Sequence, residues 1–184
     1  MSGRLRSAAV SDDDFVRLDP DLDEAGKVDA VARLVSGRPV TPDSVLGADA
    51  DCEALLDFLI AVYLGRDDFC AVIVEDVMLD RLSHDKKLEV LTRLLRRHGV
   101  TEAPYATLVA DLRKLRAFRN LLAHTVAPVG DPLHRTRRRG GQNVPVEVTV
   151  EEVADNLDRA MRCASALLFL GDLRTRPVAA EAEG

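Results

Sequence analysis

Three residues in the second half of the chain combine side chains that transfer protons and bind anions: Arg119, Asn120 and His124. A histidine has a pKa near physiological pH, so it can take up or release a proton during a reaction. The forked guanidinium of an arginine can hold a phosphate and stabilise charge that develops on it. Asn120 precedes His124 by one helical turn, where its amide can bond to the imidazole and fix the tautomer. Neither proton transfer nor phosphate binding of this kind requires a metal ion.

These residues belong to a segment, residues 105–126, whose apolar side chains recur at alternating steps of three and four. This spacing predicts a helix that buries one side. At about 100° per residue, Arg119 falls about 40° from Leu115, among the leucines, so its guanidinium must pair or reach a polar cavity. The roughly opposite side carries the polar residues Asn120, His124, Arg113 and Arg116.

Residues 119–124 read RNLLAH, an arginine followed by a polar residue and, five positions on, a histidine. This run resembles the signature of the HEPN family of all-α domains, which are small helical bundles and in many cases metal-independent ribonucleases. The run ends a long amphipathic segment, follows three helix-like segments and precedes one more, which is the order that HEPN domains have. The resemblance covers roughly residues 45–174.

The resemblance implies that Arg119, Asn120 and His124 form a catalytic site for RNA cleavage. Five helical residues amount to about 140° of rotation, so a single helix does not bring Arg119 and His124 together. HEPN ribonucleases pair two such helices about a dyad, which implies a homodimer here. Such domains commonly act in toxin–antitoxin or anti-phage systems, which implies an antitoxin or a defence-complex protein as a partner. HEPN toxins that a nucleotidyltransferase antitoxin modifies typically carry a tyrosine where this chain has Val126, so we do not expect that form of control.

A second interpretation of the motif stays open. In it, Arg119 makes a buried ion pair with Asp76, Asp80 or Asp111, and His124 interacts with the last carbonyl groups of its helix. The chain would then be a non-catalytic HEPN-like module that dimerises and acts as a scaffold for a partner protein or a nucleotide.

A basic cluster follows the helix, although the chain as a whole has a formal net charge of −6. A domain that binds nucleic acid non-specifically is usually basic overall, so we expect any RNA contact to be local. The cluster either contacts a phosphate backbone or is a solvated, mobile loop, and it lacks the interleaved aromatic residues that stack on bases. The residues expected to bind RNA are Arg113, Arg116, Arg135, Arg137, Arg138 and Arg139.

The periodicity of the chain predicts an all-α fold, an antiparallel helical bundle. Helices are expected over residues 49–64, 68–82 and 85–98, from about 101 to 127, and from 149 to about 170. Thr149 with Glu152 is a capping-box pattern that starts the last helix. Residues 133–150 suggest a β hairpin or a flexible arm before that helix. In the second helix the side chains expected to face the core are Val72, Ile73, Val77, Met78 and Leu82.

With 184 residues and 47% apolar content, the chain is expected to bury one core, in a domain spanning residues 45–175. Residues 1–44 are acidic and predict a partly ordered extension with a short helix over 24–35, which could dock the chain in a larger complex. Residues 176–184 predict a disordered tail. His84 and His98 are expected to cap helix ends, and Lys87 to face solvent.

The three cysteines occur without the paired spacing of zinc or redox sites, which predicts reduced thiols and a cytoplasmic protein. The chain has no apolar leader segment and no stretch of transmembrane length, so we expect no membrane association. It also lacks the glycine-rich phosphate loops and the zinc motif HExxH, so we expect neither a cofactor nor a metal.

Overall fold

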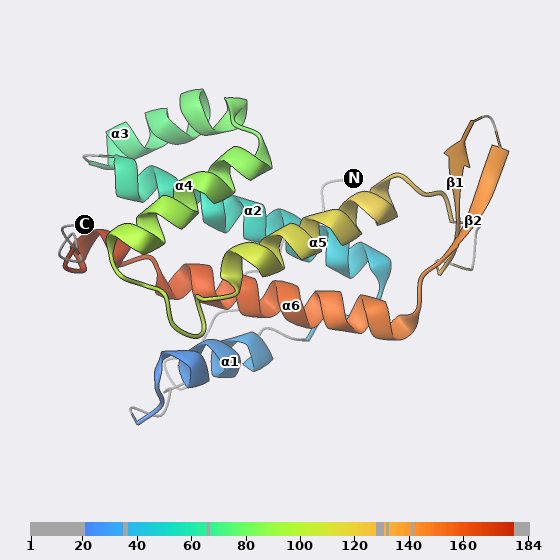
Figure 1. Ribbon diagram of the computed structural model, residues 1–184, viewed down its shortest axis with the longest axis horizontal. Helices are drawn as coiled ribbons and strands as arrows, with labels where there is room; N and C mark the ends of the chain where they lie inside the picture. The colour runs from blue at the N-terminus through green and yellow to red at the C-terminus, as the bar shows by residue number, and fades with distance from the viewer. Residues whose placement is uncertain are drawn as a thin grey trace, which may run out of the picture.

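The computed structural model describes residues 21–34, 37–65, 67–127, 131, 133–140 and 142–178. In these residues the chain is mostly helical and forms one small antiparallel sheet of two strands (Figure 1), as the periodicity predicted. The main elements are α1 (Glu24–Leu34), α2 (Pro42–Leu64), α3 (Asp68–Ile73), α4 (His84–Arg97), α5 (Leu108–Ala123), β1 (His134–Arg139), β2 (Gln142–Glu147) and α6 (Val150–Phe169).

The core lies where α2, α5 and α6 pack together, and α1 covers the other side of α6 (Figure 1). Leu112, Leu115 and Leu122 of α5 are buried in this core, on the side that the leucine spacing predicted. The capping box at Thr149 is present, with both of its hydrogen bonds to Glu152 formed. In the described residues, no helix combines the length and the apolarity needed to cross a membrane.

Two helices begin at residues that differ from the prediction. α2 begins at Pro42 rather than Asp49, because the Thr41 hydroxyl accepts a hydrogen bond from the Ser44 amide and proline suits the first helical turn. α5 begins at Leu108 rather than near residue 101, since residues 103–107 form turns that bury the Tyr105 side chain. The earlier start of α2 places Asp49 well inside a helix that packs against α5.

The segment predicted as a helix over residues 68–82 is helical from Asp68 to Arg81, but it is not one regular α-helix. α3 ends at Ile73, and a π-helical turn (Val74–Met78) and a 3-10 turn (Leu79–Arg81) follow it. A helical period of 3.6 residues does not persist through such turns, so positions extrapolated at 100° per residue go out of phase. Met78 is 53% exposed, whereas the next residue, Leu79, is 1% exposed.

The side of α3 that faces α2 also differs from the prediction. A Cβ on Gly65, at the end of α2, would lie 2.7 Å from the Ala71 Cα, so the two backbones approach each other closely there. This contact turns the Ala71 side of α3 toward α2. Four of the five side chains that we expected to face the core are largely exposed instead, namely Val72, Ile73, Val77 and Met78, whereas Leu82 is half-buried against the core.

Part of the N-terminal extension belongs to the folded bundle. Val28 and Ala32 of α1 are buried against the core, and the buried Ser165 hydroxyl of α6 donates a hydrogen bond to the Val28 carbonyl, at 2.9 Å. Arg176, just after α6, forms an ion pair with Glu24 at 3.2 Å. The rest of the predicted extension before residue 21, and of the predicted tail after residue 178, lies outside the described residues.

The hairpin is present and is attached to the end of α5. β1 and β2 are antiparallel, with His134 opposite Glu147 and Arg139 opposite Gln142. The Val126 amide donates a hydrogen bond to the Thr136 carbonyl, and the Thr136 amide donates one in return, each at 2.8 Å. Figure 1 shows the two strands standing apart from the bundle, beyond the C-terminal end of α5.

Candidate functional site

Arg119 lies at the edge of the packed side of α5 and not within it. Its side chain is 38% exposed, and its Nε lies 3.8 Å from Asp49 Oδ2 on α2. Its Nη1 donates a hydrogen bond to Asn120 Oδ1 at 3.3 Å. The acid beside Arg119 is thus Asp49 and none of the three that we expected, one of which, Asp111, pairs with Arg159 of α6.

Asp49 is shared with a second arginine of the same helix. Arg116 Nη1 lies 2.9 Å from Asp49 Oδ2 and 2.9 Å from Glu53 Oε2. Asp49 is 3% exposed, so these contacts satisfy a carboxylate that is otherwise shielded from solvent. Partial burial acts to lower the pKa of Arg116, but the hydrogen bonds and charges of Asp49 and Glu53 outweigh it and raise the pKa overall. Arg116 therefore remains charged.

Three acids recur every four residues on one side of α2, and they form a network of ion pairs with cations of α4 and α5. Asp49 and Glu53 face α5, and Asp57 accepts a hydrogen bond from Lys87 of α4 at 2.6 Å. Lys87 also lies 3.7 Å from Glu53 and is 5% exposed, so the expectation that it faces solvent is wrong. The four-residue spacing is visible in the sequence and could have revealed the network. We call these six residues the charge ladder: Asp49, Glu53, Asp57, Lys87, Arg116 and Arg119.

His84 lies within electrostatic reach of the charge ladder. Ser83, not His84, caps α4, by accepting a hydrogen bond from the Lys86 amide. Both ring nitrogens of His84 are buried, and neither has a hydrogen-bond partner among the described residues. Burial of the ring lowers the pKa of His84, and the charge of Arg116 lowers it further, against the opposing effect of Glu53, Asp49 and Asp85. His84 therefore places a neutral imidazole next to the charge ladder.

His124 is the exposed residue that ends α5. Its backbone amide donates to the Asn120 carbonyl at 3.0 Å, which closes the last helical turn. The Asn120 side chain bonds to Arg119, and no side-chain hydrogen bond joins it to His124 in the described structure. The predicted contact that would fix the imidazole tautomer is therefore absent from this arrangement, and Asn120 helps to orient the arginine instead.

The six arginines expected to bind RNA fall into different environments. Arg113 on α5 and Arg137 and Arg138 on β1 are exposed. Arg116 belongs to the charge ladder, and the Arg139 side chain lies outside the described residues. Arg135 is half-buried, and its guanidinium bonds to the Thr125 hydroxyl and to the carbonyl groups of Leu122 and Thr125. Three of the six arginines are therefore exposed to solvent, and two others, Arg116 and Arg135, form contacts that stabilise the fold.

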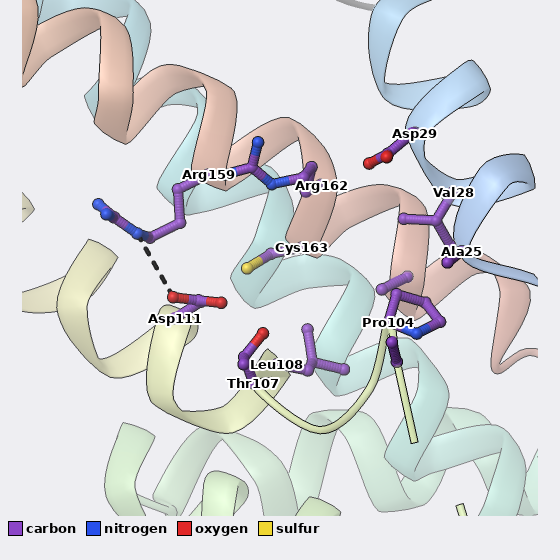
Figure 2. Close-up of a pocket in the computed structure, with 12 residues that line it drawn as sticks. Ala25, Val28, Asp29, Pro104, Thr107, Leu108, Asp111, Arg159, Arg162 and Cys163 are labelled. Carbon is purple, nitrogen blue, oxygen red and sulfur yellow. Dashed lines mark ion pairs between the residues drawn. The ribbon is translucent and has the colours of Figure 1, made fainter. Parts of the chain in front are cut away.

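A separate cavity of about 210 Å³ lies between α1, the start of α5 and α6 (Figure 2). At its rim Arg159 Nε lies 3.5 Å from Asp111 Oδ1, while Arg162 pairs with Asp158. Burial raises the pKa of the Cys163 thiol in the lining to about 12, so this cysteine is not a nucleophile at neutral pH. The rim arginines already have acidic partners, and no residue of the expected RNA site is among the described residues that line the cavity.

Among the described residues, no group of three or more His, Cys, Asp and Glu side chains is arranged to hold a metal ion. The end of α5 presents an arginine oriented by two neighbours and, five residues later, an exposed histidine. Comparison of the chain with protein-family models, with curated proteins and with solved structures gives no match.

Proposed function

We propose that the chain is a metal-independent endoribonuclease of the HEPN type, which acts as a homodimer in a toxin or anti-phage defence system. One observation carries the proposal: Arg119 is partly exposed and is held through Nε by Asp49 and through Nη1 by Asn120. Neither contact uses Nη2, so the guanidinium can still bind a phosphate oxygen. His124, exposed at the end of the same helix, supplies the proton transfer.

The proposed reaction is attack by a ribose 2′-hydroxyl on the neighbouring phosphorus. One His124 takes the 2′ proton, the new O–P bond forms, and the bond from phosphorus to the 5′ oxygen breaks. His124 of the second subunit gives a proton to that leaving oxygen, and Arg119 stabilises the charge on the phosphate. The products are a 2′,3′-cyclic phosphate, or a 3′-phosphate after hydrolysis, and a 5′-hydroxyl. Two copies are required because about 140° of helix rotation separates the two side chains within one subunit.

The hairpin supports the proposal because it carries exposed cations and is attached to the end of α5, where His124 lies. Arg137 and Arg138 are exposed on β1, and Arg135 fixes the strand to the last turn of α5. Exposed arginines on such an arm can neutralise backbone phosphates and release counterions, which gives binding without sequence preference. Arg113 is also exposed, but it lies eleven residues before His124 on α5, so it would contact a more distant part of a bound RNA. The three free cysteines suit a reducing compartment such as the cytoplasm.

One observation favours a second candidate, a non-catalytic HEPN-like module that binds a partner protein or a nucleotide. Arg119 is the sixth member of a charge ladder that contains three acids and three bases, so its charge is already compensated within the protein. In that case the arginine serves the packing of α2 on α5. The exposed His124 then has no chemical role.

An RNA cleavage assay in EDTA separates the two candidates. The wild type is expected to release products with a 5′-hydroxyl end, and Arg119→Ala and His124→Ala are each expected to slow cleavage by about 100-fold or more. The control is Lys114→Ala, which removes an exposed cation of the same helix, 3.6 Å from Asp111, and should leave cleavage unchanged. Circular dichroism and sedimentation of each variant establish that fold and dimer persist. A folded wild-type dimer that cleaves no RNA would support the scaffold instead.

A further inference from the structure

One carboxylate oxygen holds two arginines of α5. Asp49 Oδ2 lies 2.9 Å from Arg116 Nη1 and 3.8 Å from Arg119 Nε. The Asp49 side chain is 4% exposed and sits in the middle of α2, a helix that packs directly against α5. Its position is therefore set by the packing of the bundle, whereas the longer arginine side chains have many rotamers available.

We propose that Asp49 is a positioning residue for Arg119, which sets the direction from which the guanidinium meets a phosphate. The inference rests on the proposed RNA-cleaving site. An arginine that is more than one-third exposed samples many rotamers unless a fixed partner restricts it. Asp49 supplies that partner at Nε and Asn120 supplies another at Nη1, so the remaining donors point in a defined direction.

The balance of charges explains why Arg119 in particular depends on Asp49. Arg116 and Arg119 are three residues apart on one side of α5, where like charges repel. Asp49 is the negative charge that both of them contact. Without it, the ladder has two acids for three cations. Of these cations Arg119 has the most exposed side chain, at 38% against 26% for Arg116 and 6% for Lys87, so it is the one that can turn away into solvent.

This role predicts opposite effects on RNA binding and on catalysis. Removing the charge of Asp49 makes the surface around Arg119 more positive, which maintains or strengthens attraction to phosphates. The same change releases the guanidinium from its orientation, which slows the chemical step. A residue that only stabilised the fold would lower the active fraction of protein without improving the affinity for RNA.

The test compares Asp49→Asn with a matched control, Asp57→Asn, in the full chain. Asp57 is another acid on the same side of α2, but it forms its ion pair with Lys87, on α4. The first measurement is the ¹⁵N relaxation of the Arg119 Nε–H group by NMR. Asp49→Asn is expected to increase the motion of this group, and Asp57→Asn to leave it as in the wild type. An unchanged Arg119 signal in Asp49→Asn would overturn the proposal.

The second measurement is the cleavage of RNA by the same proteins. Asp49→Asn is expected to lower kcat by about 10- to 100-fold, with KM unchanged or reduced, because misplacement by about 1 Å has an effect of this size. Asp49→Glu keeps the charge but moves it by one methylene group, so kcat should fall less. Wild-type kcat in Asp49→Asn would overturn the positioning role, and so would a proportional loss in Asp57→Asn.

The two proposals can fail separately. If the wild type cleaves no RNA, the proposed ribonuclease function fails, while the Arg119 relaxation still shows whether Asp49 orients the guanidinium. If Asp49→Asn does not fold, Asp49→Glu takes its place in both measurements. In that variant, unchanged Arg119 relaxation together with unchanged kcat would overturn the positioning role.

Discussion

Arg135 of β1 donates a hydrogen bond from Nη2 to the carbonyl oxygen of Leu122, 2.9 Å away in the last turn of α5. A cation at this end of a helix also interacts favourably with the helix dipole, and here it shares the Leu122 carbonyl with the Thr125 hydroxyl, which donates to it at 3.0 Å. The contact therefore fixes the hairpin to the last turn of α5, just before His124.

We therefore expect Arg135 and Arg138, three residues apart on one strand, to respond differently to alanine substitution. Arg135→Ala should lower the free energy of unfolding by about 1.5 to 3 kcal/mol, because it removes charged hydrogen bonds at half-buried carbonyl groups. Arg138→Ala, at an exposed position, should change it by less than about 0.5 kcal/mol. Urea unfolding measures both values. Equal losses would show that Arg135 is not an anchor.

The same pair also tests the RNA-binding role of the hairpin. For Arg138→Ala, the slope of log binding constant against log salt concentration should fall by about one, as for the loss of one phosphate contact. The affinity should fall similarly for RNAs of unrelated sequence. A salt dependence identical to that of the wild type would remove Arg138 from the RNA contact surface.

The turn after α3 provides a second prediction, from two adjacent residues. Leu79→Ala should lower the free energy of unfolding by about 2 to 5 kcal/mol, because the side chain is 1% exposed and its loss leaves a cavity. Met78→Ala should have an effect below about 0.5 kcal/mol, since Met78 is 53% exposed. Chemical denaturation compares the two. A large loss of unfolding free energy in Met78→Ala would instead favour the regular helix predicted from the sequence, in which Met78 faces the core.

His84 provides a prediction about pH. Burial lowers its pKa in the folded state below the ordinary value of 6.5, so the unfolded state binds this proton more readily. Where the unfolded state binds more protons, the free energy of unfolding rises with pH. Stability is therefore lost as the pH falls from 6.5 through the lowered pKa, and no further loss from this group follows below it.

The measurement is the urea midpoint of the wild type and of His84→Gln at a series of pH values from 7.5 downwards. The wild type should lose more stability than the variant over this range, because the variant has no imidazole to protonate. An NMR titration of the four histidines provides an independent check. A His84 titration midpoint at or above 6.5 would contradict the prediction.

Features that depend on short stretches of chain could be predicted from the sequence. The leucines of α4 at 88, 91, 94 and 95 are buried as their spacing predicted, because periodicity depends only on the geometry of one helix. Thr149 and Glu152 form their capping box because both partners lie within one turn. Of the two alternatives for residues 133–150, a hairpin or a flexible arm, the hairpin is present, with a turn at Gly140, which adopts a φ of +58°.

Features that depend on the packing of distant segments could not be predicted in this way. Val72 and Ile73 are exposed because Gly65 allows α3 to approach α2 through Ala71, a contact between helices. Similarly, the sequence shows an arginine among the α5 leucines that needs a partner, but three acids were equally plausible and none was correct. The relative rotation of α2 and α5 selects Asp49.

For the candidate site, the sequence by itself determined that Arg119, Asn120 and His124 share one helix and that a basic segment follows. Only the tertiary structure decided that Arg119 belongs to a charge ladder, that Asn120 bonds to the arginine, and that Arg135 anchors the hairpin. The physical reason is the range of the forces involved. Helix formation and capping depend on neighbours within a few residues, whereas the partner of a half-buried charge depends on which helices pack together and in which orientation.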